Sequence, residues 1–211
     1  MNRIARITLA AAAVTAIGVT TLSIDGAVSA TGTRHKAILR DTAGATLGRA
    51  TFFTSDGHTR VSVWLRQMPV GASVDSFHGF HIHANNVPDN GVGCIANADP
   101  ALAFVSADAH WNNEDGVAKT HGAHLGDLPS LYVNSDGSVS STFTIDRVQA
   151  SLLTGKALVL HAGPDNFGNV PVGDVATAPN AYTPNSAGAT TATQNTGNAG
   201  NRIACGVITP A

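Results

Sequence analysis

The amino-acid sequence predicts an all-β domain, an antiparallel β-sandwich or barrel of about eight short strands with two long functional loops. Three observations indicate this class: short segments alternate between apolar and other residues, turn signals separate them, and no stretch keeps a helical period. The alternation is clearest over residues 60–68, where Val61, Val63 and Leu65 would share one face of a strand.

Turn residues predict which of these segments are joined as hairpins. Ser-Asp-Gly at 55–57 would connect the second and third segments, and Asn-Ser-Asp-Gly at 134–137 the fifth and sixth. In chain order, the predicted strands are residues 35–40, 48–54, 60–68, 77–83, 131–133, 139–145, 156–162 and 202–208.

Two stretches do not have the strand pattern. Residues 84–127 carry Cys94 and most of the remaining histidines, and we interpret them as a functional loop. Residues 166–201 consist largely of Ala, Thr, Asn, Gly and Pro, with Asp174 as their one charged residue. This second loop is predicted to be part active-site wall and part flexible insert.

The N-terminal residues 1–30 are predicted to be a secretory signal peptide. Arg3 and Arg6 precede an apolar stretch, and small residues near Ala30 form a cleavage site. An uncleaved membrane anchor is the weaker alternative, because Thr and Ala dilute the apolar stretch. Residues 31–211 would then be one domain, secreted or retained in the cell envelope or periplasm.

The charge of the chain argues against several classes of partner. Residues 1–30 hold two Arg and one Asp, so residues 31–211 keep 10 of the 12 basic and 13 of the 14 acidic residues, a formal charge of −3. This balance does not suggest nucleic-acid binding. No second apolar run is long enough to span a bilayer. The sequence leaves open whether the protein is a monomer or a homodimer.

Cysteine usage fits an exported protein. Cys94 and Cys205 are the two cysteines of the sequence, and in an oxidising compartment a bridge between them is the default. The alternative, two thiolate metal ligands, lacks the close C-x-x-C spacing of zinc sites.

The stretch FHGFHIH at 77–83 places three histidines in seven residues. On a strand, His81 and His83 would point to one side and His78 to the other. Two imidazoles so placed suit copper or zinc. For an isolated H-x-H, a strand with satisfied polar histidines is the preferred interpretation, so the rest of the chain must decide.

Further metal-ligating residues lie in the first loop and at the end of a later strand. With the pair on the strand they make six imidazoles and one carboxylate, enough for a four-nitrogen copper site and an N/O zinc site that share one imidazole. They are His110, His121, His124, Asp127 and His161.

Four motifs in order resemble the copper/zinc superoxide dismutase family: GFHIH at 79–83, HLGDLPSL at 124–131, LVLHAGPD at 158–165 and GNAGNRIACGVI at 197–208. The resemblance implies an eight-stranded Greek-key β-barrel. It also implies an enzyme that converts superoxide to dioxygen and hydrogen peroxide by Cu(II)/Cu(I) cycling. The family is itself an established example of this architecture and of electrostatic steering.

The resemblance also implies the role of each site residue. Copper would be bound by His81, His83, His110 and His161, and zinc by His110, His121, His124 and Asp127. His110 would bridge the two ions and take part in proton transfer. Asp165 matches the carboxylate that links copper-side and zinc-side histidines, and Arg202 matches the arginine beside copper that holds the anion. Cys94 and Cys205 match the disulfide of the family.

The chain departs from the family in two places. Only two residues separate His121 from His124, so the zinc loop is shortened, and a solvated loop histidine is the alternative role for His121. Residues 166–201 contain one charged residue, Asp174, and no basic one. Attraction of the superoxide anion would therefore depend mainly on Arg202.

Two other functions fit parts of the pattern. A non-enzymatic copper-binding or buffering module on the same fold could be expected to lose Arg202 or a copper ligand, and this chain keeps both. A zinc hydrolase would need a carboxylate base beside an open metal position, and Glu114 is the one glutamate near the histidine motifs.

Overall fold

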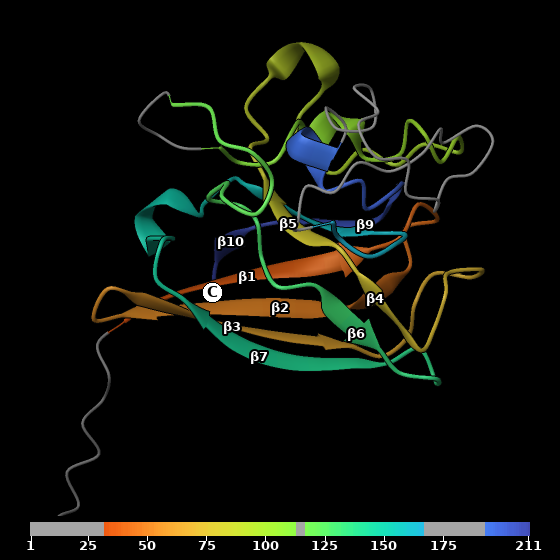
Figure 1. The fold of residues 1–211 in the computed structure, drawn as a ribbon, viewed down its shortest axis with the longest axis horizontal. Helices are drawn as coiled ribbons and strands as arrows, with labels where there is room; N and C mark the ends of the chain where they lie inside the picture. Colours follow the sequence, from red (N-terminus) through yellow and green to blue (C-terminus); the bar gives the residue numbers. More distant parts are fainter. Residues whose placement is uncertain (1–31, 113–116, 167–192) are drawn as a thin grey trace, which may run out of the picture. The chain divides into compact units, whose positions relative to one another are not determined.

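Strands make up most of the regular structure in the computed structural model, which describes residues 32–112, 117–166 and 193–211 (Figure 1). The predicted signal peptide and most of the predicted loop at 166–201 lie outside these residues. The strands are β1 (Thr33–Arg40), β2 (Thr46–Ser55), β3 (His58–Leu65), β4 (Ser76–His78), β5 (Phe80–His83), β6 (Leu131–Val133), β7 (Val139–Ile145), β8 (Ala157–His161), β9 (Arg202–Val207) and β10 (Thr209–Pro210). Short 3-10 helices lie between them: η1 (Pro88–Asn90), η2 (Val105–Ala107) and η3 (Ala150–Leu152).

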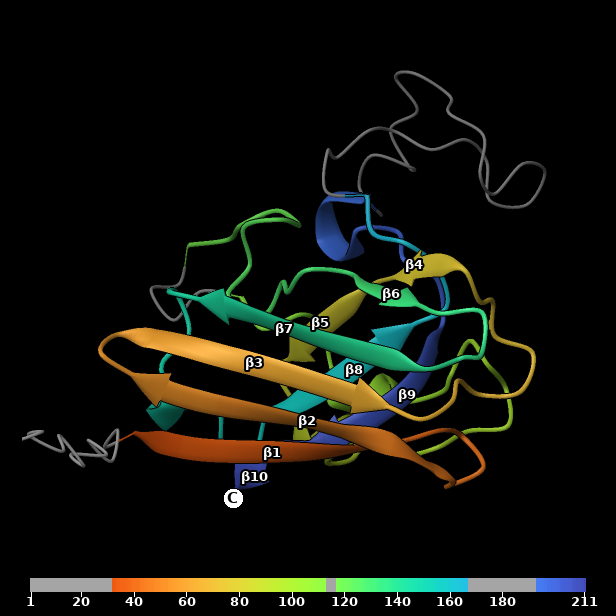
Figure 2. The same cartoon turned by 90° about the horizontal axis from the view of Figure 1, so that it is seen from below.

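The strands form two antiparallel sheets. The larger has eight strands in the order β5-β8-β9-β1-β2-β3-β7, with β10 beside β1, and the smaller pairs β4 with β6. In Figure 2, β1, β2, β3 and β7 lie in front of β5, β8 and β9, so the large sheet curls into a half-barrel. The neighbours β1/β9 and β3/β7 are far apart in sequence, as the long connections of a Greek-key fold require. The predicted all-β class is confirmed.

Apolar side chains from the strands fill the interior of the half-barrel. Val61, Val63 and Leu65 are all buried, as the alternation in β3 predicts. Phe80 and Ile82 of β5 belong to the same cluster, which places the two strands on either side of one core. Each fully buried side chain of this size contributes about 1.5–3 kcal/mol through the hydrophobic effect.

The predicted strand at 77–83 is wrong in one respect, because it breaks at Gly79 into β4 and β5, which belong to different sheets. At the break, the amide of Gly79 donates to the Gly163 carbonyl at 2.8 Å. A Cβ at Gly79 would lie 2.7 Å from both Asp165 Oδ1 and the Cβ of Ala199. The close approach of three segments therefore requires glycine and interrupts the strand.

Of the two predicted hairpins, one is confirmed and one is wrong. β2 and β3 pair up to Ser55 opposite His58. At 134–137 the chain does turn, with the Gly137 amide donating to the Asn134 carbonyl at 2.9 Å. The strands on either side then separate, because β6 pairs with β4 and β7 with β3.

Candidate metal centre

Four histidines from three parts of the chain converge at one end of the half-barrel. His81 and His83 lie on β5, and His161 ends β8. His110 belongs to the loop at 84–127, and its backbone forms an isolated antiparallel β-bridge with that of His83. All four residues are at most 5% exposed. One ring nitrogen from each can be chosen so that all four lie within 4.8 Å of one another.

In each of the four rings, one nitrogen is held by a hydrogen bond that points away from the centre of the cluster. The donors and acceptors are His81 Nε2 to Asp165 Oδ1 at 2.8 Å, His83 Nδ1 to the Asp108 carbonyl at 2.8 Å, His110 Nδ1 to Asp127 Oδ1 at 2.9 Å and His161 Nδ1 to the Gly200 carbonyl at 3.0 Å. These bonds fix the tautomer and the orientation of each ring.

The other nitrogen of each ring is buried and, within the part of the chain that the structure describes, has no hydrogen-bond partner. These atoms are His81 Nδ1, His83 Nε2, His110 Nε2 and His161 Nε2. A buried lone pair without a hydrogen-bond partner is unfavourable, and four such lone pairs lie close together here. Imidazole nitrogen is a good ligand for copper and zinc, so these residues fit a four-nitrogen metal site.

The protonation of these rings also suits metal binding. Burial lowers the pKa of His83 and of His161 well below the usual value, and the neighbouring histidines and Arg202 lower both further. Burial lowers the pKa of His110 to about 4, although Asp127 partly opposes this. At neutral pH these three rings are uncharged, which is the form that coordinates a metal.

A second cluster surrounds the buried carboxylate of Asp127. Its Oδ1 lies 2.9 Å from His110 Nδ1, 3.2 Å from His121 Nδ1 and 3.3 Å from His124 Nδ1. Atoms of His81, His110, His121 and Asp127 also lie within 4.8 Å of one another. His124 is outside that group, but it contacts the same carboxylate.

The hydrogen bonds of His124 indicate why a cation would suit this cluster. Its Nε2 donates to the Lys119 carbonyl at 2.9 Å, and a neutral ring that donates from Nε2 has a lone pair on Nδ1. In such a ring the lone pair would face the carboxylate of Asp127, and two acceptors facing each other are unfavourable unless a cation lies between them. A zinc ion between them would replace this contact with two bonds from ligands that zinc prefers.

Electrostatics in the second cluster are dominated by two carboxylates. Burial raises the pKa of Asp127, but its contacts with the rings of His110, His121 and His124 outweigh burial and hold the pKa well below the usual range. Burial lowers the pKa of His121, yet Asp127 and Asp165 raise it to about 9. Without a metal, His121 is therefore protonated at neutral pH.

Asp165 lies between the two clusters. Its Oδ1 is 2.8 Å from His81 Nε2 and 3.4 Å from His121 Nε2, and its Oδ2 accepts from Ser130 Oγ at 2.6 Å. Burial raises its pKa, and the contacts with His121 and His81 lower it to below the usual range. A single anion thus orients one ring from each cluster.

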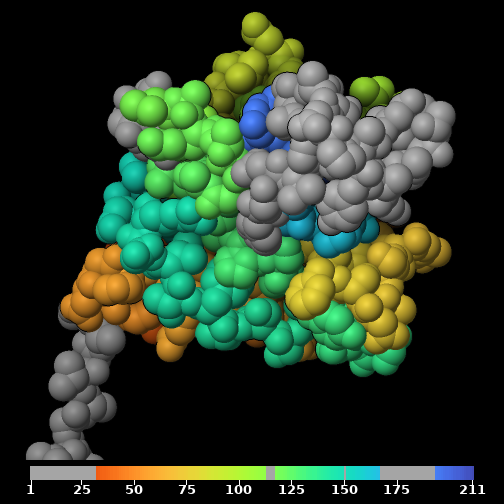
Figure 3. Space-filling view, viewed as in Figure 1, coloured from red at the N-terminus to blue at the C-terminus, as the bar shows by residue number. Residues whose placement is uncertain are grey.

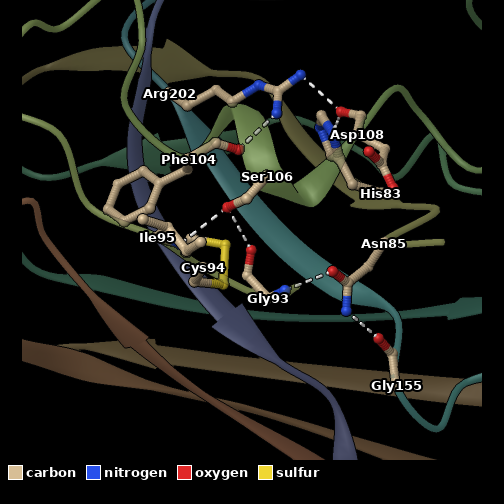
Figure 4. The surroundings of a disulfide bond; sticks show 11 residues. His83, Asn85, Gly93, Cys94, Ile95, Phe104, Ser106, Asp108, Gly155 and Arg202 are labelled. Atoms are coloured by element: carbon tan, nitrogen blue, oxygen red, sulfur yellow. Dashed lines mark hydrogen bonds between the residues drawn. A yellow bond between two sulfur atoms is a disulfide. The ribbon is translucent and has the colours of Figure 1, made fainter. Parts of the chain in front are cut away.

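Arg202 lies beside the four-histidine cluster and is held by two carbonyl groups of the loop at 84–127. Its Nη1 donates to Phe104 and its Nη2 to Asp108, each at 2.6 Å (Figure 4). The Asp108 carbonyl also accepts from His83 Nδ1. Burial lowers the pKa of Arg202, but a guanidinium stays charged at neutral pH.

A cleft of about 520 Å³ opens onto this arrangement. His83, His110, His161 and Arg202 all contribute to its wall. A small anion that enters the cleft therefore meets three histidines of the first cluster and a fixed positive charge.

The predicted disulfide between Cys94 and Cys205 is confirmed, with the two Cα atoms 5.5 Å apart. It joins the loop at 84–127 to β9, three residues beyond Arg202 (Figure 4). Because that loop supplies both carbonyl groups bound by Arg202, the bridge restrains the guanidinium together with its acceptors.

His78 has the separate place that the sequence predicts for it. It lies on β4, and its Nδ1 donates to the main-chain carbonyl of His161 at 2.8 Å. It therefore supports the backbone of a residue in the first cluster and does not join the cluster.

Arg147 is a site residue that sequence reasoning missed. Its Nη2 donates to the Asp127 carbonyl at 2.5 Å and its Nη1 to the Gly122 carbonyl at 3.4 Å. In Figure 3 the green stretch that follows residue 117 lies next to the teal stretch that follows β7. The guanidinium thus holds both ends of the stretch 122–127. An isolated arginine after a strand carries no motif that could have revealed this.

Asp108 is the second residue that sequence reasoning missed. Its φ of 67° and ψ of −159° lie in a region that is almost restricted to glycine. Its carboxylate accepts from the amides of Asn86 and Val87 at 2.5 and 2.9 Å and from Asn90 Nδ2 at 2.7 Å. These bonds stabilise the strained backbone whose carbonyl orients His83 and Arg202.

Comparison with known proteins agrees with this geometry. The family model described as copper/zinc superoxide dismutase (SODC) matches residues 46–208. The proteins named superoxide dismutase [Cu-Zn] from Mycobacterium bovis and Mycobacterium tuberculosis are each 34% identical over 171 residues, covering 78% of this chain and 65% of theirs. The chain therefore spans slightly less than two thirds of the length of these two relatives.

A relative of the same name from Schizosaccharomyces pombe is 33% identical over 170 residues, covering 76% of this chain and 88% of its own. Among solved structures, the clock protein EA4 superposes with a TM-score of 0.58 at 24% identity, covering 86% of this chain and 96% of that one. This last likeness concerns the fold alone.

Proposed function

The chain belongs to the copper/zinc superoxide dismutase family, and we propose that it converts two superoxide anions and two protons into dioxygen and hydrogen peroxide. The observation that carries the proposal is the set of four buried ring nitrogens that converge beside Arg202 at the wall of an open cleft. A copper-buffering module would have no need for a fixed cation at that position.

The proposed copper ligands are the four converging nitrogens of His81, His83, His110 and His161. Copper would supply the electron transfer, because it cycles between Cu(II) and Cu(I) and zinc does not. We assign zinc to the second cluster, with Asp127 and the Nδ1 atoms of three histidines as its ligands. These are His110, His121 and His124.

The remaining chemistry belongs to side chains of the protein. Arg202 would bind the superoxide anion through a charge-assisted hydrogen bond, with its guanidinium already oriented by Phe104 and Asp108. His110 lines the cleft and belongs to both proposed ligand sets. If its Nε2 were released from copper, that atom would be free to take up a proton, and it is therefore the atom that we expect to pass a proton to the oxygen of the substrate.

We also propose that the protein is exported. The disulfide supports this, because such bridges persist mainly in oxidising compartments. The predicted signal peptide at 1–30 would direct the export. In the described part of the chain, no helix has the length and apolar character needed to cross a bilayer.

Two substitutions test the proposal. His83→Ala should abolish superoxide consumption by protein incubated with copper, and bound copper should fall in elemental analysis. Arg202→Glu should keep bound copper and lower kcat/KM far more than Arg202→Lys does. Raising the salt concentration should slow the wild-type enzyme but not the Glu variant, since screening weakens attraction in one and repulsion in the other. Unchanged activity of His83→Ala would refute the ligand assignment.

A further inference from the structure

The outer face of β1, β2 and β3 carries an unusual concentration of positive charge. We call it the basic face: Arg34, Lys36, Arg49 and Arg60 point outward from these strands and are exposed, and Arg40 and Arg66 extend the face at its edge. It holds six of the ten basic residues in 31–211. The other four and the 13 acidic residues give the rest of that region a formal charge of 4 minus 13, or −9.

Acidic side chains do not neutralise the basic face. β1, β2, β3 and the neighbouring β7 contain no Asp or Glu. Asp41, in the turn after β1, uses its Oδ1 to accept from the amides of Ala43 and Ala45. All ion pairs among the described residues join a histidine to Asp127 or Asp165, so none involves the basic face. The uncompensated charge creates a local positive potential on a chain that is negative as a whole.

The register of the strands arranges these cations as a two-dimensional array. Phe53 lies between Arg34 and Arg60 on the neighbouring strands, and Trp64 lies opposite Arg49. Strands are about 4.8 Å apart and every second residue is about 7 Å along, so the charges are spread over a broad area of the sheet. An extended anionic surface fits this array better than a single small anion does.

Arginines of the basic face lie over the rings of Phe53 and Trp64. The guanidinium carbons of Arg34 and Arg60 lie 4.4 and 5.5 Å from the centre of the Phe53 ring, and that of Arg49 lies 5.6 Å from the Trp64 ring. Single-stranded nucleic acid is held largely by bases that stack on open aromatic rings, which these contacts disfavour. Trp64 and Ile38 remain 46% and 39% exposed, and tryptophan beside basic residues suits the headgroup region of a bilayer.

From these observations we infer that the basic face docks the protein onto a bilayer of anionic phospholipid. This inference is independent of the proposed enzymatic function. No residue of β1, β2 or β3 contributes to the wall of the metal cleft. Residues of the cleft wall therefore take no part in docking through the basic face.

Sedimentation of the purified protein with phospholipid vesicles tests the inference. Vesicles of phosphatidylcholine with phosphatidylglycerol should bind the protein at low salt, pure phosphatidylcholine should not, and rising salt should release it. Each basic residue near an anionic membrane changes binding about fivefold. The triple variant Arg34→Gln, Arg49→Gln and Arg60→Gln should therefore bind about 100-fold more weakly.

A matched control separates the basic face from net charge. Val70→Glu, Asn97→Asp and Gln149→Glu lower the charge by the same three units at exposed loop positions outside β1, β2 and β3. We expect this control to bind within about threefold of wild type, because distant charges are screened. A lysine variant of the three arginines should also retain most binding, since it keeps the charge.

Several results would overturn the inference. They are absence of binding to anionic vesicles at low salt, equal binding to neutral vesicles, equal weakening of the triple variant and its control, or tight binding of single-stranded DNA with none of vesicles. Circular dichroism of every variant verifies that a loss of binding does not reflect unfolding.

Discussion

Arg147 offers a sharp test of how the second cluster is held together, through the substitution Arg147→Ala. The side chain donates to main-chain carbonyls at both ends of the stretch 122–127, at 2.5 Å to Asp127 and 3.4 Å to Gly122. The stretch itself supplies His124 and Asp127, two of the proposed zinc ligands. Without the guanidinium, zinc binding must itself order the stretch 122–127. The free-energy cost of this ordering lowers the affinity for zinc.

The size of the effect follows from the two bonds. A hydrogen bond to a charged group contributes about 1.5–3 kcal/mol when buried. The longer bond to Gly122 is exposed and adds little, so we expect about 1–2 kcal/mol for Arg147 as a whole. Zinc affinity should then fall roughly 5- to 30-fold. Copper affinity should fall less, because the proposed copper ligands lie outside 122–127.

Competition of the protein with a zinc chelator measures this affinity. Arg147→Lys should lie between Arg147→Ala and wild type, because a lysine keeps one donor. The matched control is Arg66→Ala, which removes an exposed arginine directly after β3. If Arg147→Ala bound zinc within twofold of wild type, or if Arg66→Ala weakened binding equally, the positioning role would be wrong. A wild-type protein that binds no zinc would refute the ligand assignment itself.

Three further predictions concern stability and protonation. Replacing Cys94 and Cys205 by Ser should lower the free energy of unfolding in urea by about 4–5 kcal/mol, because the bridge spans a separation of 111 residues; a loss below about 1 kcal/mol would contradict this. Asp108→Gly should be more stable than Asp108→Ala by about 1–3 kcal/mol, since glycine tolerates the observed backbone angles, and equal stability would argue against strain. The pKa of His121 is raised to about 9, so zinc must displace a proton below that pH. Apparent zinc affinity should rise about tenfold per pH unit from about pH 7 and level off above about 9, and an affinity independent of pH would contradict the assignment.

Much of the fold and of the site can be predicted from the sequence because the signals are local. Alternation in β3 identifies its buried face, and the spacing of His81 and His83 places both rings on one side of a strand. The disulfide follows from the count of cysteines and the expected compartment. In each case the information lies within a few residues or in residue type alone.

The remaining features depend on contacts between distant segments. The break at Gly79 arises because Asp165 and Ala199 approach its backbone, and the turn at 134–137 does not reveal that β6 and β7 pair with different strands. Arg202 is oriented by main-chain carbonyls, which every residue possesses. The strain at Asp108 is equally invisible, since aspartate is ordinary in loops.

The most direct test of the central claim is superoxide consumption by the purified protein as a function of its bound copper. We predict a rate that rises in proportion to copper and saturates at about one copper per chain, with four nitrogen ligands in the electron paramagnetic resonance spectrum of the Cu(II) form. Protein that holds about one copper per chain and consumes superoxide no faster than its copper-free form would contradict the proposed function.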